Sequence, residues 1–178
     1  MSVLRWLVTI VSYPIGGLIA IQVSSTTAGP PSAALGGALA GAVIGTAQWL
    51  ALRPRVNALW VAVTSGSFGV GAALGVAATA SATTIGALAT YGAIAGLVVG
   101  IGQSVFLRIG WRSAVWAATV AVTWAVAWIV SATVIVDEAR GFVTFGLSGA
   151  AIVVAVSAVA LRLLIGPRVS GTAQAVTV

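Results

Sequence analysis

Two stretches of the chain are near-copies of each other, and each of them ends in an arginine. Residues 37–53 and 92–108 are identical at nine of 17 positions when they are aligned at a constant offset of 55. A third stretch, closed by Arg162, retains Gly146 and Leu161 but differs at most other positions. A repeat of this kind predicts a fold assembled from equivalent supersecondary units.

The composition places these units in a membrane. Of the 178 residues, 60% are hydrophobic and only 6% are charged, whereas a soluble domain carries roughly 25% charged residues. The apolar runs are about 20 residues long, which is the length a helix needs to cross the hydrocarbon core of a bilayer. They are continuous rather than alternating, which argues against a β-barrel. We therefore expect an all-α integral membrane protein, with residues 1–178 forming a single transmembrane domain.

Six spans are predicted, and short polar or Gly/Pro-containing breaks separate them. The expected spans are 6–23, 33–52, 58–78, 85–107, 113–135 and 143–165. Residues 24–32 are predicted to be a loop, and residues 167–178 a short tail. Pro14, which precedes Gly16 and Gly17, predicts a kink in the first span.

Arginine placement predicts the orientation. In a six-span arrangement one side carries Arg5, Arg53, Arg55, Arg108, Arg112, Arg162 and Arg168. The other side carries Arg140 beside the two acidic residues, Asp137 and Glu138. Because cytoplasmic loops carry the excess of basic residues, we expect both termini to be cytoplasmic. The use of arginine without lysine and the excess of Ala, Val and Gly suggest a GC-rich bacterial genome, so we expect the chain in the inner (plasma) membrane. The net charge of +6 is then explained by topology, and no nucleic-acid partner is expected.

The repeating unit is predicted to be a hairpin of two spans. Each closing arginine ends an even-numbered span, and each odd-numbered span begins near a tryptophan. The hairpins cover approximately residues 1–55, 56–110 and 111–166. Since two spans return the chain to the same side, the repeats are parallel, and their axis runs along the membrane normal. We expect a pseudo-threefold bundle.

Glycines form a ladder in each of the two clear copies. Gly37, Gly41 and Gly45 are four residues apart, as are Gly92, Gly96 and Gly100, so each set lies on one stripe of its helix. One interpretation is close helix packing, since small residues let backbones approach each other. The other is a smooth groove for a lipid, a pigment or a solute. The ladder is absent from the third copy, so the three interfaces are not expected to be equivalent.

Three polar residues lie five positions before the closing arginines: Gln48, Gln103 and Ser157. At about 1.5 Å per residue, they lie inside the hydrocarbon, where an unbonded amide is costly. Two interpretations are open. The side chains form hydrogen bonds between helices, or they ring the pseudo-threefold axis and line a polar mouth.

The tryptophans divide into two groups. Those near the predicted cytoplasmic interface are expected to form an anchoring belt; they are Trp6, Trp49, Trp60, Trp111 and Trp116. Trp124 and Trp128 lie four residues apart near the middle of the fifth span. They either pack in the core or contact a flat ligand, such as a carotenoid, a quinone or a sterol-like lipid, or a partner subunit.

Few residues could carry out chemistry. The chain has no cysteine and no histidine, so thiolate and imidazole ligands for zinc, haem or iron–sulfur clusters do not exist. Asp137 and Glu138 are adjacent in a predicted loop, and no ionisable residue lies at mid-span, where ion or proton coupling usually needs one. We expect no enzyme activity, no metal site and no obligatory cofactor.

The segment 45–53 reads G-x-x-Q-W-L-x-L-R and resembles segments of uncharacterised bacterial multi-pass membrane proteins. The second copy, residues 100–108, departs from this pattern at Ser104 and Phe106. No activity is attached to these proteins, so the resemblance implies nothing about function. Two functions fit the chain. The first is an accessory or scaffold subunit of a larger membrane complex, with a protein partner or a second copy and with bound lipid or pigment. The second is a passive channel or carrier, or a substrate-binding membrane subunit, for a small neutral solute.

Overall fold

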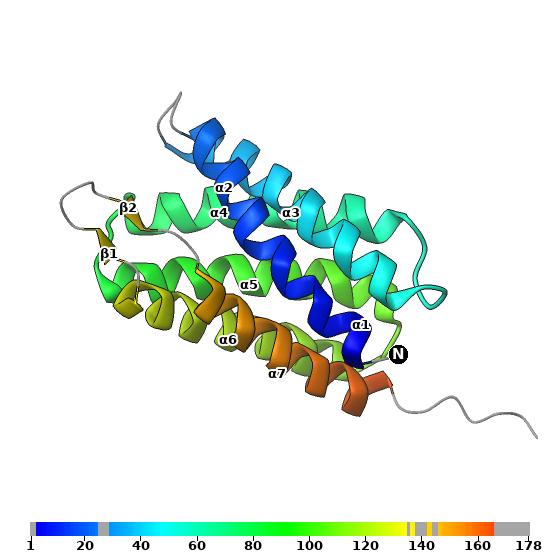
Figure 1. Cartoon of the computed structure of the whole chain (residues 1–178). Coiled ribbons are helices and arrows are strands. Elements are labelled where there is room, and N and C mark those ends of the chain that lie inside the picture. Colours follow the sequence, from blue (N-terminus) through cyan, green and yellow to red (C-terminus); the bar gives the residue numbers. More distant parts are fainter. Residues whose placement is uncertain (1–2, 25–28, 135, 138–141, 144–145, 166–178) are drawn as a thin grey trace, which may run out of the picture.

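The computed structural model of the chain describes residues 3–24, 29–134, 136–137, 142–143 and 146–165. Within these residues, six helices are long and apolar enough to cross a membrane (Figure 1). The prediction of an all-helical, six-span membrane protein is therefore confirmed. Glu138, Arg140, Arg168 and the tail 167–178, on which the sequence made predictions, lie outside the described residues.

Span one consists of three consecutive helical pieces, and each later span is one helix. The first span contains α1 (Val3–Leu7), the 3-10 helix η1 (Val8–Val11) and α2 (Ser12–Ser24). The others are α3 (Pro30–Leu52), α4 (Leu59–Thr79), α5 (Ile85–Leu107), α6 (Arg112–Val134) and α7 (Leu147–Ile165). The predicted fourth span coincides with α5, and the third and fifth differ from α4 and α6 by one residue at each end.

The 3-10 turn in span one ends at Val11, three residues before Pro14, which lies in the first turn of α2. There the Ser12 N–H bonds back to Thr9 O, three residues earlier. Proline has no N–H to donate and its ring crowds the preceding turn, so the regular bonding pattern cannot continue through this segment. The structure thus has a tightened turn ahead of Pro14, and the kink that the sequence predicts there stays a prediction.

The second span begins earlier than predicted. Pro30, Pro31 and Ser32 were expected in a loop, but they form the first turn of α3. Proline suits this position because the first N–H groups of a helix have no partner within the helix. Gly29, with a φ of 87°, allows the chain to turn into the helix in a conformation that side chains disfavour.

The sixth span begins later than predicted. Residues 143–146 were expected to be helical, but α7 starts at Leu147. Val143 belongs instead to strand β2 (Phe142–Val143), which pairs antiparallel with β1 (Val136–Asp137). The apolar run in the sequence therefore starts in a short strand that precedes the helix. Composition alone could not separate the strand from the helix.

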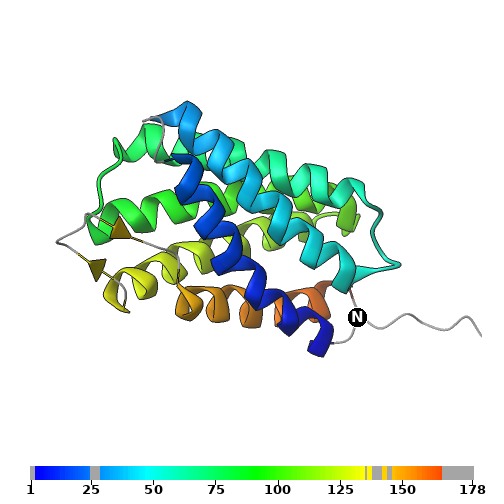
Figure 2. The same cartoon turned by 45° about the horizontal axis from the view of Figure 1, so that its top comes forward.

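The six spans pack in a closed ring in the order of the sequence. Each span contacts its neighbours along the chain, and α7 contacts α1, η1 and α2 of span one. Figure 2 shows span one, in blue, crossing between α3 and α7. Three of the interfaces in this ring join one predicted hairpin to the next: α3 with α4, α5 with α6, and α7 with span one.

The two glycine ladders lie in the first two of these interfaces, which we call the glycine seams. A Cβ atom on Gly41 would lie 2.7 Å from Phe68 Cβ and 2.9 Å from Ser65 Cα, both on α4. A Cβ on Gly96 would lie 2.7 Å from Val120 O and 2.8 Å from Trp124 Cβ, both on α6. These spaces are too small for any side chain, so the ladders are surfaces for close packing between helices. They face the next hairpin rather than the partner within their own hairpin.

The third interface, which we call the serine seam, has no glycine ladder. Ala150 and Val154 of α7 stand where the other copies have glycine, and both are fully buried. Ser157 of α7 accepts a hydrogen bond from Trp6 of α1. The sequence predicted that the three interfaces would differ, and they do.

The described arginines gather at one end of the bundle. Figure 1 places the N-terminal end of α1, the α3–α4 and α5–α6 connections and the end of α7 on the same side, opposite the β1–β2 pair. Two of these arginines bond the last carbonyls of helices: Arg5 Nη2 donates to Leu50 O at 2.6 Å, and Arg112 Nη1 to Leu164 O at 3.2 Å. These contacts satisfy carbonyls that lack a partner at a helix C-terminus.

Candidate functional site: a tryptophan–amide cluster inside the bundle

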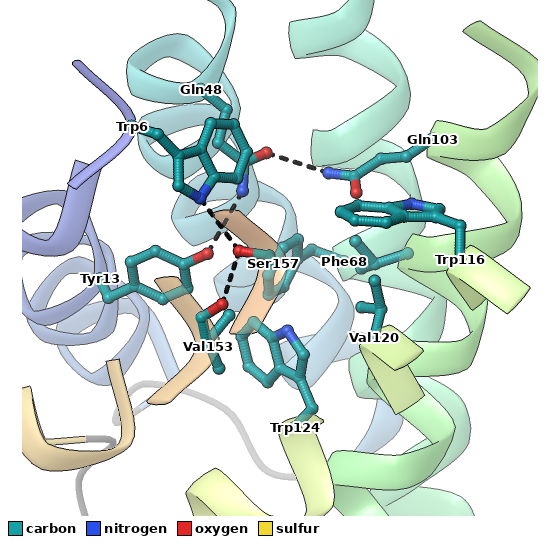
Figure 3. Close-up of a pocket in the computed structure, with 11 residues that line it drawn as sticks. Trp6, Tyr13, Gln48, Phe68, Gln103, Trp116, Val120, Trp124, Val153 and Ser157 are labelled. Atoms are coloured by element: carbon teal, nitrogen blue, oxygen red, sulfur yellow. Dashed lines mark hydrogen bonds between the residues drawn. The ribbon is translucent and has the colours of Figure 1, made fainter. Parts of the chain in front are cut away.

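The three polar residues that precede the closing arginines come together inside the bundle. Gln48 on α3, Gln103 on α5 and Ser157 on α7 are 5%, 2% and 7% exposed, and all three border the same small cavity. Three tryptophans from the other set of helices surround them. We call the six residues the tryptophan–amide cluster: Trp6, Gln48, Trp60, Gln103, Trp116 and Ser157. Figure 3 shows all of them except Trp60.

Gln48 is the centre of the hydrogen bonding. Its side-chain oxygen accepts from Trp60 Nε1 at 3.3 Å and from Gln103 Nε2 at 3.0 Å. Its side-chain nitrogen donates to the Tyr13 hydroxyl at 3.2 Å. Gln48 therefore links α3 to α2, α4 and α5, and its amide is satisfied without water.

Gln103 bonds to its own counterpart in the repeat. The two glutamines lie 55 residues apart, which is the offset of the repeat, and they are joined by the 3.0 Å bond. The Gln103 side-chain nitrogen also donates to Thr64 Oγ1 of α4 at 3.3 Å. The offset that defines the repeat in the sequence thus connects two side chains in space.

Ser157 and Trp6 connect the last helix to the first. Trp6 Nε1 donates to Ser157 Oγ at 3.0 Å and to Val154 O at 3.1 Å. The Ser157 hydroxyl itself donates to Val153 O, one turn earlier in α7. The serine therefore accepts an indole N–H from a neighbouring helix, as the longer Gln48 side chain does from Trp60.

The predicted tryptophan belt is wrong for three of its five members. Trp6, Trp60 and Trp116 are at most 1% exposed and belong to the core. Trp111 is 78% exposed, and Trp49 is half-buried beneath the Arg53 guanidinium, whose Cζ lies 4.3 Å from the ring centroid. A buried indole usually finds a hydrogen-bond partner for its N–H. Here Gln48 is the partner of Trp60 and Ser157 is the partner of Trp6.

Apolar side chains fill the interior next to the cluster. The cavity there has a volume of only about 10 Å³, which is at the lower limit for one water molecule. Its walls include Phe68, Val99, Val120, Trp124 and Val153. The amides converge, as a polar mouth requires, but the space beside them is far smaller than a solute path.

The two mid-span tryptophans pack on aromatic neighbours. The Trp124 ring lies edge-on to Phe68 with centroids 4.9 Å apart, and 6.0 Å from Tyr13. The Trp128 ring lies edge-on to Tyr91 at 5.3 Å. Trp124 is buried and Trp128 is half-buried. These contacts fit the core-packing interpretation of both tryptophans, and the flat-ligand interpretation stays a prediction.

Sequence reasoning missed Tyr13 and Thr64 as members of the bonding network. A signal for the tryptophans was present, since Trp6, Trp60 and Trp116 begin the odd-numbered spans, but it was assigned to the membrane interface. No comparable signal marks Tyr13 or Thr64.

The chemistry available to the cluster is that of neutral donors and acceptors. Among the described residues, no group of three His, Cys, Asp or Glu side chains is placed to hold a metal ion. Amides, indoles, hydroxyls and backbone carbonyls can bind through hydrogen bonds, but they do not transfer protons readily at neutral pH.

Comparison with known proteins adds no further constraint. No family model matches the chain, and neither a curated protein nor a solved structure matches it.

Proposed function

We propose that this chain is a non-enzymatic scaffold or accessory subunit that acts in a larger membrane complex as a rigid six-helix body. The observation that carries the proposal is the bonding of the cluster. Gln48 and Gln103 use their amides to join helices to one another, and the space beneath them is filled by side chains such as Phe68 and Trp124. Hydrogen bonds between helices and a small cavity in the interior support a structural role for the cluster.

The three hairpins are proposed to be related by a pseudo-threefold axis through the cluster. Two links support this arrangement: Trp60 of the second hairpin bonds Gln48 of the first, and Trp6 of the first bonds Ser157 of the third. In each link, a tryptophan meets the polar residue of the hairpin that precedes it around the ring. The glycine seams repeat the same relation, because each ladder packs on the hairpin that follows.

The arginine-bearing end is proposed to face the cytoplasm of a bacterial cell. This proposal is tested with single cysteines, which is convenient because the chain has none. Arg112→Cys should react with a membrane-impermeant maleimide only in inverted vesicles, and Thr83→Cys, exposed at the other end, only in intact spheroplasts. Labelling of both from one side would contradict the six-span orientation.

The arrangement leaves the outer surface of the bundle for contact with lipid and a partner. Large apolar side chains are exposed on every span, including Leu4, Val70, Val105, Val122 and Leu163. Lipid tails cover such surfaces in a bilayer, and a protein partner or a second copy would replace lipid on part of them.

A passive carrier of a small neutral solute is the second candidate. The observation that favours it is the convergence of Gln48, Gln103 and Ser157 on one cavity. A path would require the apolar walls below the amides to move apart.

Flux in liposomes separates the two functions. If the scaffold proposal holds, liposomes that contain the protein should swell in urea or glycerol no faster than empty liposomes. Gln48→Leu/Gln103→Leu should then lower the stability of the fold, because Trp60 Nε1 and Thr64 Oγ1 lose their partners. Gln22→Leu, which changes an exposed amide at the other end of the bundle, is the matched control. Solute flux that the double substitution abolishes while the helices remain intact would establish the carrier instead.

A further inference from the structure

One indole of the tryptophan–amide cluster has no hydrogen-bond partner. Trp6 and Trp60 donate their N–H groups to Ser157 and Gln48. Trp116 is as deeply buried, at 1% exposure, yet its Nε1 bonds to none of the described residues. Buried donors in folded proteins are almost always bonded to protein or to ordered water.

The side-chain oxygen of Gln103, the acceptor expected for Trp116, is also unused. In the other two links, a tryptophan bonds the polar residue of the preceding hairpin. The same relation pairs Trp116 with Gln103. The Gln103 nitrogen donates to Gln48 and Thr64, while its oxygen accepts no hydrogen bond among the described residues. Figure 3 shows the Gln103 side-chain oxygen on the side of the amide nearest the Trp116 ring.

The residues of this donor and this acceptor both line the same water-sized space. Gln103 and Trp116 border the cavity together with Gln48, Ser157 and the apolar side chain Val120, and among these residues only Trp116 has a buried indole without a partner. The volume of about 10 Å³ admits one water molecule and nothing larger, and a buried water needs two or more polar partners to remain in place.

We propose that the cavity is a binding site for a single ordered water molecule that joins Trp116 to Gln103. The water oxygen accepts the Trp116 indole N–H, and one water hydrogen is donated to Gln103 Oε1. This water completes the third tryptophan–amide link, which the other two pairs make directly. The inference is independent of the proposed function, since a closed scaffold and a gated carrier could both hold such a water.

The test is a nuclear magnetic resonance measurement on the whole chain in detergent micelles, with the indole nitrogens labelled. The Trp116 indole proton should show a dipolar cross-peak to a long-lived water, whereas the Trp60 indole proton, bonded to Gln48, should show none. Trp111, which is 78% exposed, is the reference for contact with bulk water. The Trp116 signal is assigned as the one lost in Trp116→Phe or, if that variant does not fold, by its contacts with the methyl groups of Val120.

A second arm displaces the water. Val120→Ile adds a methylene to the wall of the cavity and should remove the Trp116–water cross-peak while the other indole signals stay in place. Val105→Ile, at a position 70% exposed, should leave it unchanged. A Trp116 proton with no water contact in the unmodified chain would overturn the proposal and indicate a direct bond to Gln103. Water contacts at Trp6, Trp60 and Trp116 alike would also overturn it, since they would indicate a hydrated path rather than a single site.

Discussion

The two glycine seams and the serine seam join hairpins in different ways. In the glycine seams, backbones approach so closely that a Cβ on Gly92 or Gly100 would lie 2.7 Å or less from a backbone or side-chain atom of α6. In the serine seam, fully buried Val154 occupies the position of the last ladder glycine, and Trp6 bonds across to Ser157. The glycine seams combine hydrogen bonds with close backbone contact along the whole ladder. The serine seam has larger buried side chains in place of the ladder, and Trp6 donates across it to Ser157 and Val154.

This difference shows that the ring can close through an interface without a glycine ladder. Inside a bilayer, lipid tails are as apolar as the helices, so association depends on close packing and interhelical hydrogen bonds. The serine seam lacks the close backbone approach that the glycines allow, so more of its stability depends on the hydrogen bonds from Trp6. We therefore expect the serine seam to be the more easily opened of the two kinds.

The largest effect is expected where a side chain enters a glycine seam. Gly96→Ala places a Cβ 2.7 Å from Val120 O, so α5 and α6 must move apart. Overpacking of this kind costs about 1–3 kcal/mol, and Gly96→Leu should prevent folding. The free energy of unfolding in mixed micelles, measured by titration with a denaturing detergent, gives the size of the loss.

Gly66→Ala is the matched control for this substitution. Gly66 is exposed on α4, and a Cβ there would meet no atom within 4 Å. The change should be neutral or stabilising, since glycine inside a helix costs about 0.5–1 kcal/mol relative to alanine. Equal losses for Gly66→Ala and Gly96→Ala would mean that the ladder has no special role in packing.

A smaller loss of stability is expected when Trp6 or Trp60 is replaced by phenylalanine. The two substitutions should differ in which seam they affect. Trp6→Phe removes the indole N–H that reaches Ser157 and Val154, and Trp60→Phe removes the one that reaches Gln48. Interhelical hydrogen bonds in membranes average about 0.6 kcal/mol, so either change should lower stability by roughly that amount.

Only Trp6→Phe should open a seam locally. Amide hydrogen exchange in α7 should accelerate by about threefold, which corresponds to a loss of about 0.6 kcal/mol, while exchange in α5 stays unchanged. After Trp60→Phe, exchange in α3 should not accelerate locally, because Gly41 and Gly45 still hold α3 against α4. Faster exchange in α3 than in α7 would reverse the comparison between the seams.

The spans and the glycine seams could be predicted from the sequence because both leave a local signal. Apolar runs of membrane length gave six helices, with the bounds of α5 correct to the residue. Glycines at every fourth position indicated a packing stripe, although nothing in their spacing could show that it faces the next hairpin. The start of α7 was wrong because Val143 is as apolar as the helix that follows it.

The cluster could be predicted only in part, because its bonds join residues far apart in the chain. The equal spacing of Gln48, Gln103 and Ser157 before the arginines showed that they lie at equal depth. The bond between Trp6 and Ser157 spans 151 residues, and no local pattern indicates it. A tryptophan near a helix end fits an interfacial belt or a bonded core position equally well, and only the neighbouring helices decide between the two.

The smallest effects should come from single hydroxyls, and they give the finest test of the comparison. Ser65 Oγ donates to Ala38 O across a glycine seam at 2.7 Å, and Ser157 Oγ accepts from Trp6 across the serine seam. Ser65→Ala should cost at most a few tenths of a kcal/mol, since the packed glycines keep α3 against α4. Ser157→Ala should cost more, because Trp6 keeps only Val154 O as a partner. Unfolding titrations of both variants measure the difference, and an equal or larger loss for Ser65→Ala would mean that hydrogen bonds hold both kinds of seam alike.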